Sequence, residues 1–231
     1  MPALPARRAR TRMKSISTPR RRAIARLVLL LPLLPACRIA NQRYSTPHTE
    51  GFGLVAGQLE AGGLGFLTPS TVTGQEEDRQ PLALVFADVL AQLRKDIPIV
   101  GLPQTLSAVN RAGLTESYKR MYQDYRDSGV FEPGVLRQVG SAVGVRYMAQ
   151  LKMADFRQEA KGRFSVFGLS LVQTQAANIR LFLQIWDTQD GSIVWEGNNE
   201  LNRAYDTLSE RSVSFDTVVR ETASELIAKL P

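Results

Sequence analysis

Residues 179–195, IRLFLQIWDTQDGSIVW, decide the fold because they contain two strand-like segments joined by a turn. Apolar residues occupy every second position from Ile179 to Ile185, which predicts a half-buried β-strand. The turn contains Gly191, and glycine can adopt the positive φ that a hairpin requires. Residues 193–195 are therefore expected to return antiparallel to the first strand.

The flanking sequence predicts the remaining elements of the domain. Residues 147–154 repeat the period-two pattern of a strand, and residues 81–94 place apolar side chains at helical spacing. Further strands are expected at 65–73 and 97–102, and short helices begin near 103, 115 and 133. A last helix is expected over 209–230, with Thr207 and Glu210 forming its capping box. This order predicts an α+β fold of two layers, with helices packed on a mixed, largely antiparallel sheet.

Cys37 is the only cysteine of the chain, and it ends the segment LPAC at 34–37, after an apolar run at 27–34. A basic leader, a short apolar segment and a small residue before the cleavage position are the parts of an export signal. The run is shorter than the about 20 residues that a membrane-spanning helix needs. We therefore expect a cleaved lipoprotein signal peptide at 1–36 and acylation of Cys37. An ordinary secretory signal with a chance cysteine is the alternative.

The leader also accounts for the basic composition of the whole chain. Nine of the 29 Lys and Arg residues precede Cys37, whereas no Asp or Glu does, which leaves 20 basic and 22 acidic residues. The chain after the expected cleavage thus has a formal charge of −2. A pI near 9.8 describes the leader, and it does not indicate nucleic-acid binding. Arg21 and Arg22 leave export by the twin-arginine route open, and Met13 is an alternative start.

The chain after the leader is expected to contain a tether and one domain. Residues 38–48 have little apolar periodicity and include Pro47, so residues 37–63 are interpreted as the lipid anchor and a flexible tether. Six glycines lie between Gly51 and Gly65, but they lack the Gly-Lys-Ser/Thr ending of a phosphate-binding loop. Residues 64–231 then form the α+β domain.

The order of these segments resembles a group of bacterial envelope domains. The match rests on residues 82–93, 99–100, 136–148 and the hairpin at 179–195. In this order they resemble the periplasmic domain of the curli-secretion lipoprotein family (CsgG-like). They are also similar to the amino-terminal domain of TolB and to the penicillin-binding-protein activator lipoproteins. The resemblance covers residues 64–230 and implies a role in envelope assembly or transport, without catalytic residues to carry over.

The resemblance also implies a second possible function. Curli channel relatives form rings whose inserted hairpins span the membrane. The comparable stretch here, residues 157–175, supplies at most one short strand pair, whereas membrane-spanning strands need about 9–11 residues each and a closed barrel. A ring-forming secretion channel subunit is therefore the alternative to a scaffold protein.

Catalytic and ligand-binding side chains are few. His48 is the only histidine, so one chain has neither a histidine triad nor a site with several histidine ligands. The acidic residues Glu76, Glu77, Asp78, Asp187 and Asp190 adjoin turns and are interpreted as solvated charges. We expect no cofactor, metal or enzymatic activity, with an envelope enzyme as a second alternative. The apolar face of the helix near 115, which includes Tyr118, Tyr122 and Tyr125, is interpreted as core, with a ligand platform as the alternative.

A candidate partner surface lies on the face of the hairpin opposite the apolar one. Arg180, Phe182, Gln184 and Trp186 share this face, joined by Trp195 if its side chain points the same way. Exposed aromatic residues beside an arginine are typical of interface hot spots, although a covering helix would make them core. Arg38 follows Cys37 where an aspartate would indicate inner-membrane retention, so an outer-membrane location facing the periplasm is expected. The expected partner is an envelope protein or a second copy of the chain.

Overall fold

The computed structural model describes residues 41–72, 75–166, 169–207 and 213–231, with the backbone alone given for 162–166, 169–173 and residue 207. Contacts group Ile39–Pro231 as one unit. Cys37 and the rest of the expected signal peptide lie outside the described residues.

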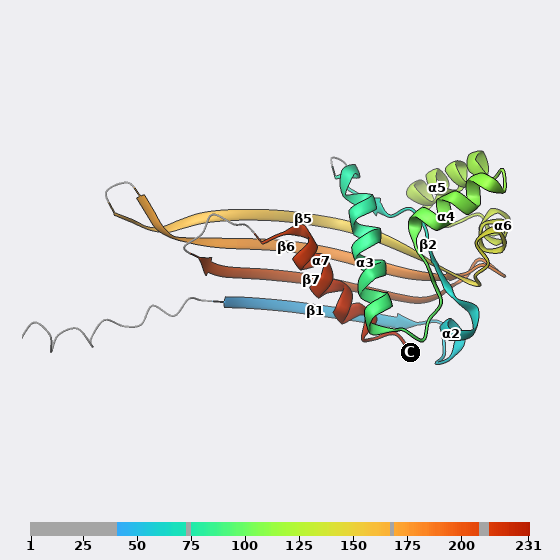
Figure 1. Ribbon diagram of the computed structural model, residues 1–231, viewed down its shortest axis with the longest axis horizontal. Coiled ribbons are helices and arrows are strands. Elements are labelled where there is room, and N and C mark those ends of the chain that lie inside the picture. Colours follow the sequence, from blue (N-terminus) through green and yellow to red (C-terminus); the bar gives the residue numbers. More distant parts are fainter. Residues whose placement is uncertain (1–40, 73–74, 167–168, 208–212) are drawn as a thin grey trace, which may run out of the picture. The chain divides into compact units, whose positions relative to one another are not determined.

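Seven strands of the described chain form one mixed sheet in the order β1-β7-β6-β5-β2-β4, with β3 beside β5 (Figure 1). β1, β7, β6 and β5 pair antiparallel, whereas β2, β3 and β4 join by parallel pairing. The strands are β1 (Asn41–Gly51), β2 (Leu64–Phe66), β3 (Ser70–Thr71), β4 (Ile99–Val100), β5 (Tyr147–Val166), β6 (Leu169–Asp187) and β7 (Ile193–Thr207). The expected mixed, largely antiparallel sheet of an α+β fold is thus confirmed.

Helices connect and cover the strands close to the expected positions. The described helices are α2 (Gln58–Gly62), the 3-10 turn η2 (Glu76–Asp78), α3 (Arg79–Leu93), α4 (Leu102–Arg111), α5 (Thr115–Ser128), α6 (Pro133–Val143) and α7 (Phe215–Ile227). Among them, no helix is both long enough and apolar enough to cross a bilayer. α5 and α6 end at Gly129 and Gly144, whose positive φ values allow the chain to leave the helix.

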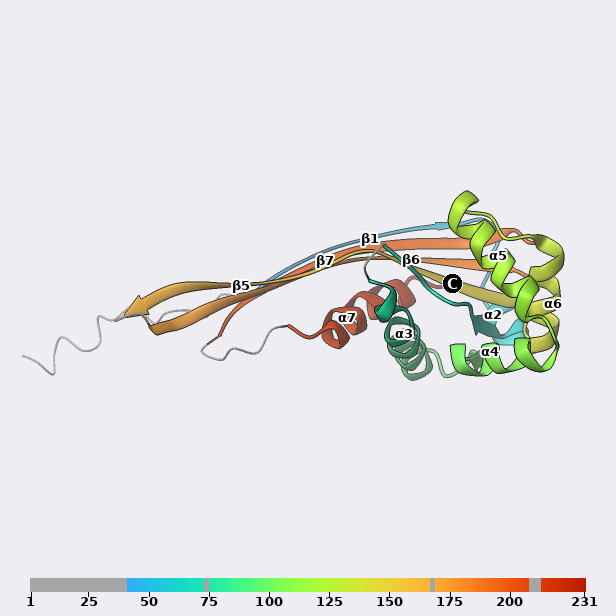
Figure 2. The same ribbon diagram turned by 90° about the horizontal axis from the view of Figure 1, so that it is seen from above.

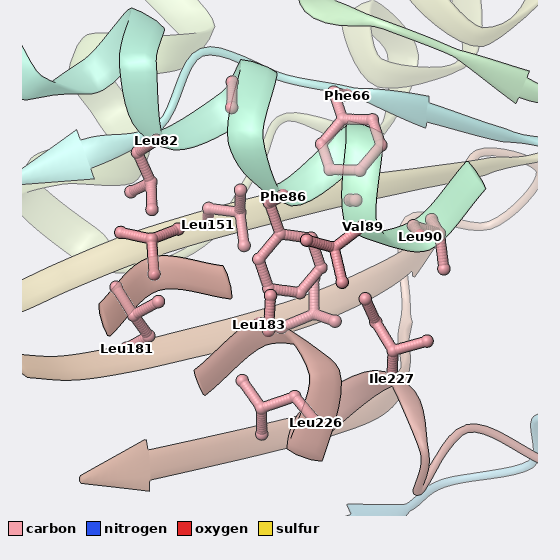
Figure 3. Packing of buried hydrophobic residues seen from close by; sticks show 14 of the residues in the cluster. Phe66, Leu82, Phe86, Val89, Leu90, Leu151, Leu181, Leu183, Leu226 and Ile227 are labelled. Carbon is pink, nitrogen blue, oxygen red and sulfur yellow. The ribbon is translucent and has the colours of Figure 1, made fainter. Parts of the chain in front are cut away.

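One face of the sheet carries the main core under α3 and α7 (Figures 2 and 3). Phe86 of α3 and Leu226 of α7 are fully buried against Leu183 of β6. These residues come from segments with clear apolar periodicity, and their burial supplies the main stabilisation of this layer. At the turn joining β6 to β7, a second core covers the opposite face, so part of the sheet lies between two helical layers.

The first strand corrects the expected tether. Residues 41–51 form β1, which pairs antiparallel with β7 along its whole length, from Asn41 opposite Tyr205 to Gly51 opposite Trp195. Its residues are mostly polar and exposed, so the sequence has no apolar alternation that would reveal a strand. Pro47 is tolerated because β1 lies at the edge of the sheet. His48 lies on this exposed strand.

The long strands and the last helix also differ from expectation. β5, β6 and β7 extend well beyond the apolar segments that predicted them, because their distal parts carry polar residues. β7 continues to Thr207, so Thr207 does not cap the last helix. Instead α7 begins at Phe215, where the Ser214 Oγ accepts the N–H of Thr217 at 3.2 Å. Glu210 lies outside the described residues.

Candidate functional site

Trp186, one of the four residues expected on an open partner surface, is buried. Only 2% of its surface is exposed. Its ring lies edge-on to Phe131, with 4.9 Å between the ring centroids, and also contacts Tyr125 of α5. Leu136 and Val139 of α6 belong to the same core. Trp186 therefore cannot present its ring to a partner in this structure, because α5 and α6 cover this end of the sheet face.

Trp195 lies on the other face of the sheet from Trp186. A register shift in the β6–β7 pairing places Trp195 opposite Ile185, whereas Trp186 pairs with Ile193. Trp195 is buried in the core under α3 and α7. The register shift is a β-bulge, which changes the face to which following residues point. Trp195 therefore does not meet the condition for joining the surface of Arg180, Phe182, Gln184 and Trp186.

Two of the other three predicted residues, Arg180 and Phe182, lie beyond the cover of α5 and α6. Arg180 is exposed and donates to Glu200 of β7 through Nε at 3.1 Å and Nη2 at 2.5 Å. These hydrogen bonds lower the pKa of the Glu200 carboxyl. Phe182 is half-buried and is flanked by Asn198 of β7 and Lys152 of β5. Arg180 and Phe182 thus remain accessible, and whether they bind a partner stays a prediction.

Gln184 connects this accessible face to the helix that covers Trp186. Its side-chain amide nitrogen donates to Glu196 of β7 at 2.6 Å, and its oxygen accepts the hydroxyl of Tyr125 at 3.1 Å. Burial raises the pKa of Tyr125 to about 12, so this hydroxyl stays protonated as a donor. The half-buried Gln184 therefore marks the boundary between the covered and the accessible parts of the face.

A groove continues along the accessible face toward the start of β1. It has a volume of about 540 Å³ and draws its lining from β1, β5, β6 and β7. We call this surface the open-face groove. Its lining includes Tyr44, Asp155, Arg157, Glu159, Ala176, Asn178, Glu200, Asn202 and Ala204.

The side chains of the open-face groove form pairs across and along the strands. Asn178 of β6 donates to Asn202 of β7 at 2.6 Å, and Arg157 donates to Asp155 on the same strand, β5, at 3.1 Å. Ala176 and Ala204 face each other across β6 and β7, so no large side chain fills the groove at this pair. Tyr44 is 67% exposed. The groove thus combines an exposed aromatic ring with amides and charges of both signs, and tyrosine and arginine are residue types enriched at protein interfaces.

A polar network behind this groove fastens β1 to α7. Glu225 of α7 accepts hydrogen bonds from Arg43 and Ser45 of β1 and from Asn199 of β7, the last at 2.7 Å. Glu221, one turn earlier, pairs with Arg43 and with Arg203 of β7. Asn199 is fully buried, and the network supplies its side-chain partners. This network explains how a polar segment is held on the sheet.

The acidic residues that could act in catalysis or bind a metal either have structural roles or lie apart from one another in the sequence. Asp187 is buried and accepts both Arg146 Nε at 2.9 Å and Nη2 at 2.7 Å, while its other oxygen accepts the N–H of Gln189. Asp190 accepts from Ser192, and these hydrogen bonds lower its pKa. Glu76, Glu77 and Asp78 form η2, away from this turn in the sequence. No cluster of three metal-ligating residues occurs within the described ranges.

The tyrosine face of α5 belongs mainly to the core. Tyr118 and Tyr125 are each 7% exposed. The hydroxyl of Tyr118 contacts the backbone N–H of Thr68 at 2.9 Å, and that of Tyr122 donates to the carbonyl of Pro69 at 2.8 Å. These bonds fasten α5 to the segment between β2 and β3. The interpretation of this face as core is confirmed for Tyr118 and Tyr125.

No sequence pattern indicates Tyr44 or the contribution of β1 to this surface. The segment has no apolar period, so its sequence predicts a tether. A strand is recognised in a sequence by the alternation of apolar and polar residues. Both faces of β1 are polar, so its sequence has no such alternation.

No protein-family model matches the chain, and neither does any curated protein. Among solved structures, the chain is similar to a PelC dodecamer from Paraburkholderia phytofirmans, at 10% identity over 81% of this chain and 97% of that one, with a TM-score of 0.44. It is also similar to the LpoB C-terminal domain from Salmonella enterica, at 15% identity over 63% and 85% of the two chains, with a TM-score of 0.34.

A lipoprotein from Neisseria meningitidis is also similar, at 10% identity over 73% of this chain and 96% of that one, with a TM-score of 0.37. Likenesses of this extent assign the chain to no family.

Proposed function

We propose that the protein is a lipid-anchored scaffold of the bacterial cell envelope, held on a membrane through Cys37 and binding another envelope protein through its open-face groove. The observation that carries the binding role is that the groove, which Tyr44 lines, continues on the sheet face where Arg180 and Phe182 are accessible. The lipobox sequence at 34–37 supports the anchor. An outer-membrane location facing the periplasm, as proposed from Arg38, completes this assignment.

A protein fits the open-face groove better than a nucleic acid. Charges of both signs line it, whereas a nucleic-acid site concentrates positive charge. β1 is the edge strand on this side of the described sheet, because it pairs with β7 alone. The groove is also open to this edge. Backbone groups along such an edge can pair with a strand of a partner.

A ring-forming subunit is the second candidate, and one observation favours it. β1 lies at one edge of the sheet, and β5 continues to Val166 although its parallel neighbour β3 ends at Thr71. β1 and β5 run in opposite directions because three antiparallel pairings separate them. Copies that paired β1 with this part of β5 would make a heterologous contact, which closes into a ring or continues as a filament.

Replacing Cys37 by serine tests the anchor. Cys37→Ser should abolish incorporation of radiolabelled palmitate and release the protein from the membrane fraction, because three acyl chains hold a protein far more firmly than one. A variant that stays on the membrane with unchanged mass would contradict the lipid anchor.

Crosslinking through the groove tests the partner. A photo-crosslinking amino acid at Tyr44 should give one discrete adduct in intact envelopes, and Arg180→Glu should reduce its yield because it reverses a charge on the same face. The matched control places the crosslinker at Leu84, which is 52% exposed on α3. Equal adducts from both positions would show that the groove is not the binding surface.

A further inference from the structure

The β5–β6 hairpin extends beyond β7 at the end of the sheet where β1 begins (Figures 1 and 2). Asn41, the first residue of β1, is level with Ala160 of β5, through Tyr205 of β7 and Gln175 of β6. From Ala160, β5 continues for six residues to Val166. At about 3.3 Å per residue, the hairpin therefore extends about 20 Å past the start of β1.

The distal part of this hairpin has an apolar and basic sequence. Residues 164–166 are FSV and residues 169–172 are LSLV, so five of these seven residues are apolar. Lys161 and Arg163 precede them, and no Asp or Glu occurs between Glu159 and Asp187. β7 ends at Thr207, opposite Gln173, so beyond this point the described sheet has two strands only. An isolated two-stranded ribbon is marginally stable in water, and apolar residues at its end favour an apolar environment.

Chain length places the proposed anchor within reach of this ribbon. Cys37 precedes Asn41 by four residues, which span at most about 14 Å when fully extended. A bilayer that holds the acyl chains of Cys37 therefore lies within about 14 Å of the start of β1. The hairpin reaches about 6 Å farther than this, which is the depth at which interfacial elements enter the boundary between headgroups and acyl chains. It is too short to cross a hydrocarbon core of about 30 Å.

We infer that the end of the β5–β6 hairpin, residues 164–166 and 169–172, inserts into the same membrane leaflet that holds the acylated Cys37. Arg163, about 10 Å past the start of β1, then lies near the level of the lipid phosphates, where basic residues are attracted to anionic headgroups. The domain thereby contacts the membrane at two points, the anchor and the hairpin, which fixes its orientation. This inference rests on the proposed acylation of Cys37.

Fluorescence quenching in vesicles tests the insertion. The full lipidated protein, carrying Val166→Cys or Ser165→Cys, is labelled with a polarity-sensitive maleimide and reconstituted into phosphatidylethanolamine–phosphatidylglycerol vesicles. Gln189→Cys, in the turn between β6 and β7 at the opposite end of the sheet, is the matched control. Brominated lipids should quench the labels at 165 and 166 at least about threefold more than the label at 189, because only the hairpin enters the acyl boundary.

The two ways in which this scheme can fail are distinguishable. Acylated Cys37 has no free thiol, so the wild-type protein should take up no maleimide. A labelled wild-type protein would overturn the proposed anchor, whatever the hairpin does. An unlabelled wild-type protein, combined with equal quenching of all three variants by aqueous iodide, would overturn the insertion of the hairpin alone.

Discussion

At the scale of single residues, the environment of Trp186 decides which part of the sheet face is available. Trp186 lies edge-on to the stacked rings of Phe131 and Tyr125, and its Nε1–H is buried without a hydrogen-bond acceptor among the described residues. Phe182, two positions earlier on the same face, is only half-buried. The boundary between core and candidate partner surface therefore falls between these two side chains, at Gln184.

Trp186→Ala should lower the free energy of unfolding by about 3–5 kcal/mol, because it leaves a cavity in a closed aromatic cluster. Trp186→Phe should lower it by only about 1 kcal/mol, since a phenyl ring keeps most of the packing and removes a buried N–H that has no partner. Urea unfolding of the two variants measures both changes. Phe182→Ala, at the accessible position, is the control and should be milder than Trp186→Ala. A loss below about 1 kcal/mol for Trp186→Ala would show that the cluster is open.

At the scale of elements, β1 depends on tertiary contacts to a greater degree than any other long strand. Its sequence is polar, and its exposed edge gains nothing from apolar burial. Pairing with β7 and the bonds from Arg43 and Ser45 to Glu225 hold it in place. An edge strand fastened by polar groups opens more easily than a central strand, so β1 is the element that a change in α7 can release.

Glu225→Ala should release β1, and hydrogen exchange measures this. In the wild-type protein, about half of the amides in Asn41–Gly51 should exchange slowly, because alternate residues of an antiparallel edge strand donate to their neighbour. The variant should exchange these amides faster, since Arg43, Ser45 and the buried Asn199 lose their common acceptor. Glu50→Ala, on β1 but outside this network, should leave the pattern unchanged. Immediate exchange throughout β1 in the wild-type protein would restore the interpretation of a flexible tether.

At the scale of the whole molecule, the proposed scaffold and ring differ in how the sheet edges are used. A scaffold leaves β1 free for a different protein, whereas a ring pairs it with β5 of the next copy. Prolines and charged residues on an edge strand oppose its pairing with another copy. β1 is polar and contains Pro47, so its sequence opposes self-association. We therefore favour the scaffold.

The chain from Arg38 onward, without its acyl chains, should be a monomer in detergent-free buffer. Light scattering at increasing protein concentration measures its mass. Discrete closed oligomers would instead favour the ring-forming subunit. Thr49→Pro removes a backbone N–H that faces away from β7, because the hydrogen bond from Phe52 N to the Val194 carbonyl puts the N–H groups of the even-numbered residues on the β7 side. Thr49→Pro should then dissociate the oligomers if β1 forms the contact. A matched substitution on the exposed surface of α5, Lys119→Ala, should not.

Local patterns allowed much of the fold to be predicted. The hairpin at 179–195 and the helices α3 to α6 follow from apolar spacing, glycine stops and prolines at helix starts, which act over a few residues. The distal halves of β5, β6 and β7 could not be predicted, because strands with polar residues on both faces have no period to detect.

The sequence by itself determined that Arg180, Phe182, Gln184 and Trp186 share one side of a strand, and that Cys37 ends a lipobox-like segment. Only the tertiary structure decided that α5 and α6 bury Trp186 while Arg180 stays accessible, and that a bulge sends Trp195 to the opposite core. It also decided that Asn41–Gly51 is a strand. The physical reason is that periodicity fixes relative faces within a segment, whereas burial and edge pairing depend on elements that lie far away in the sequence.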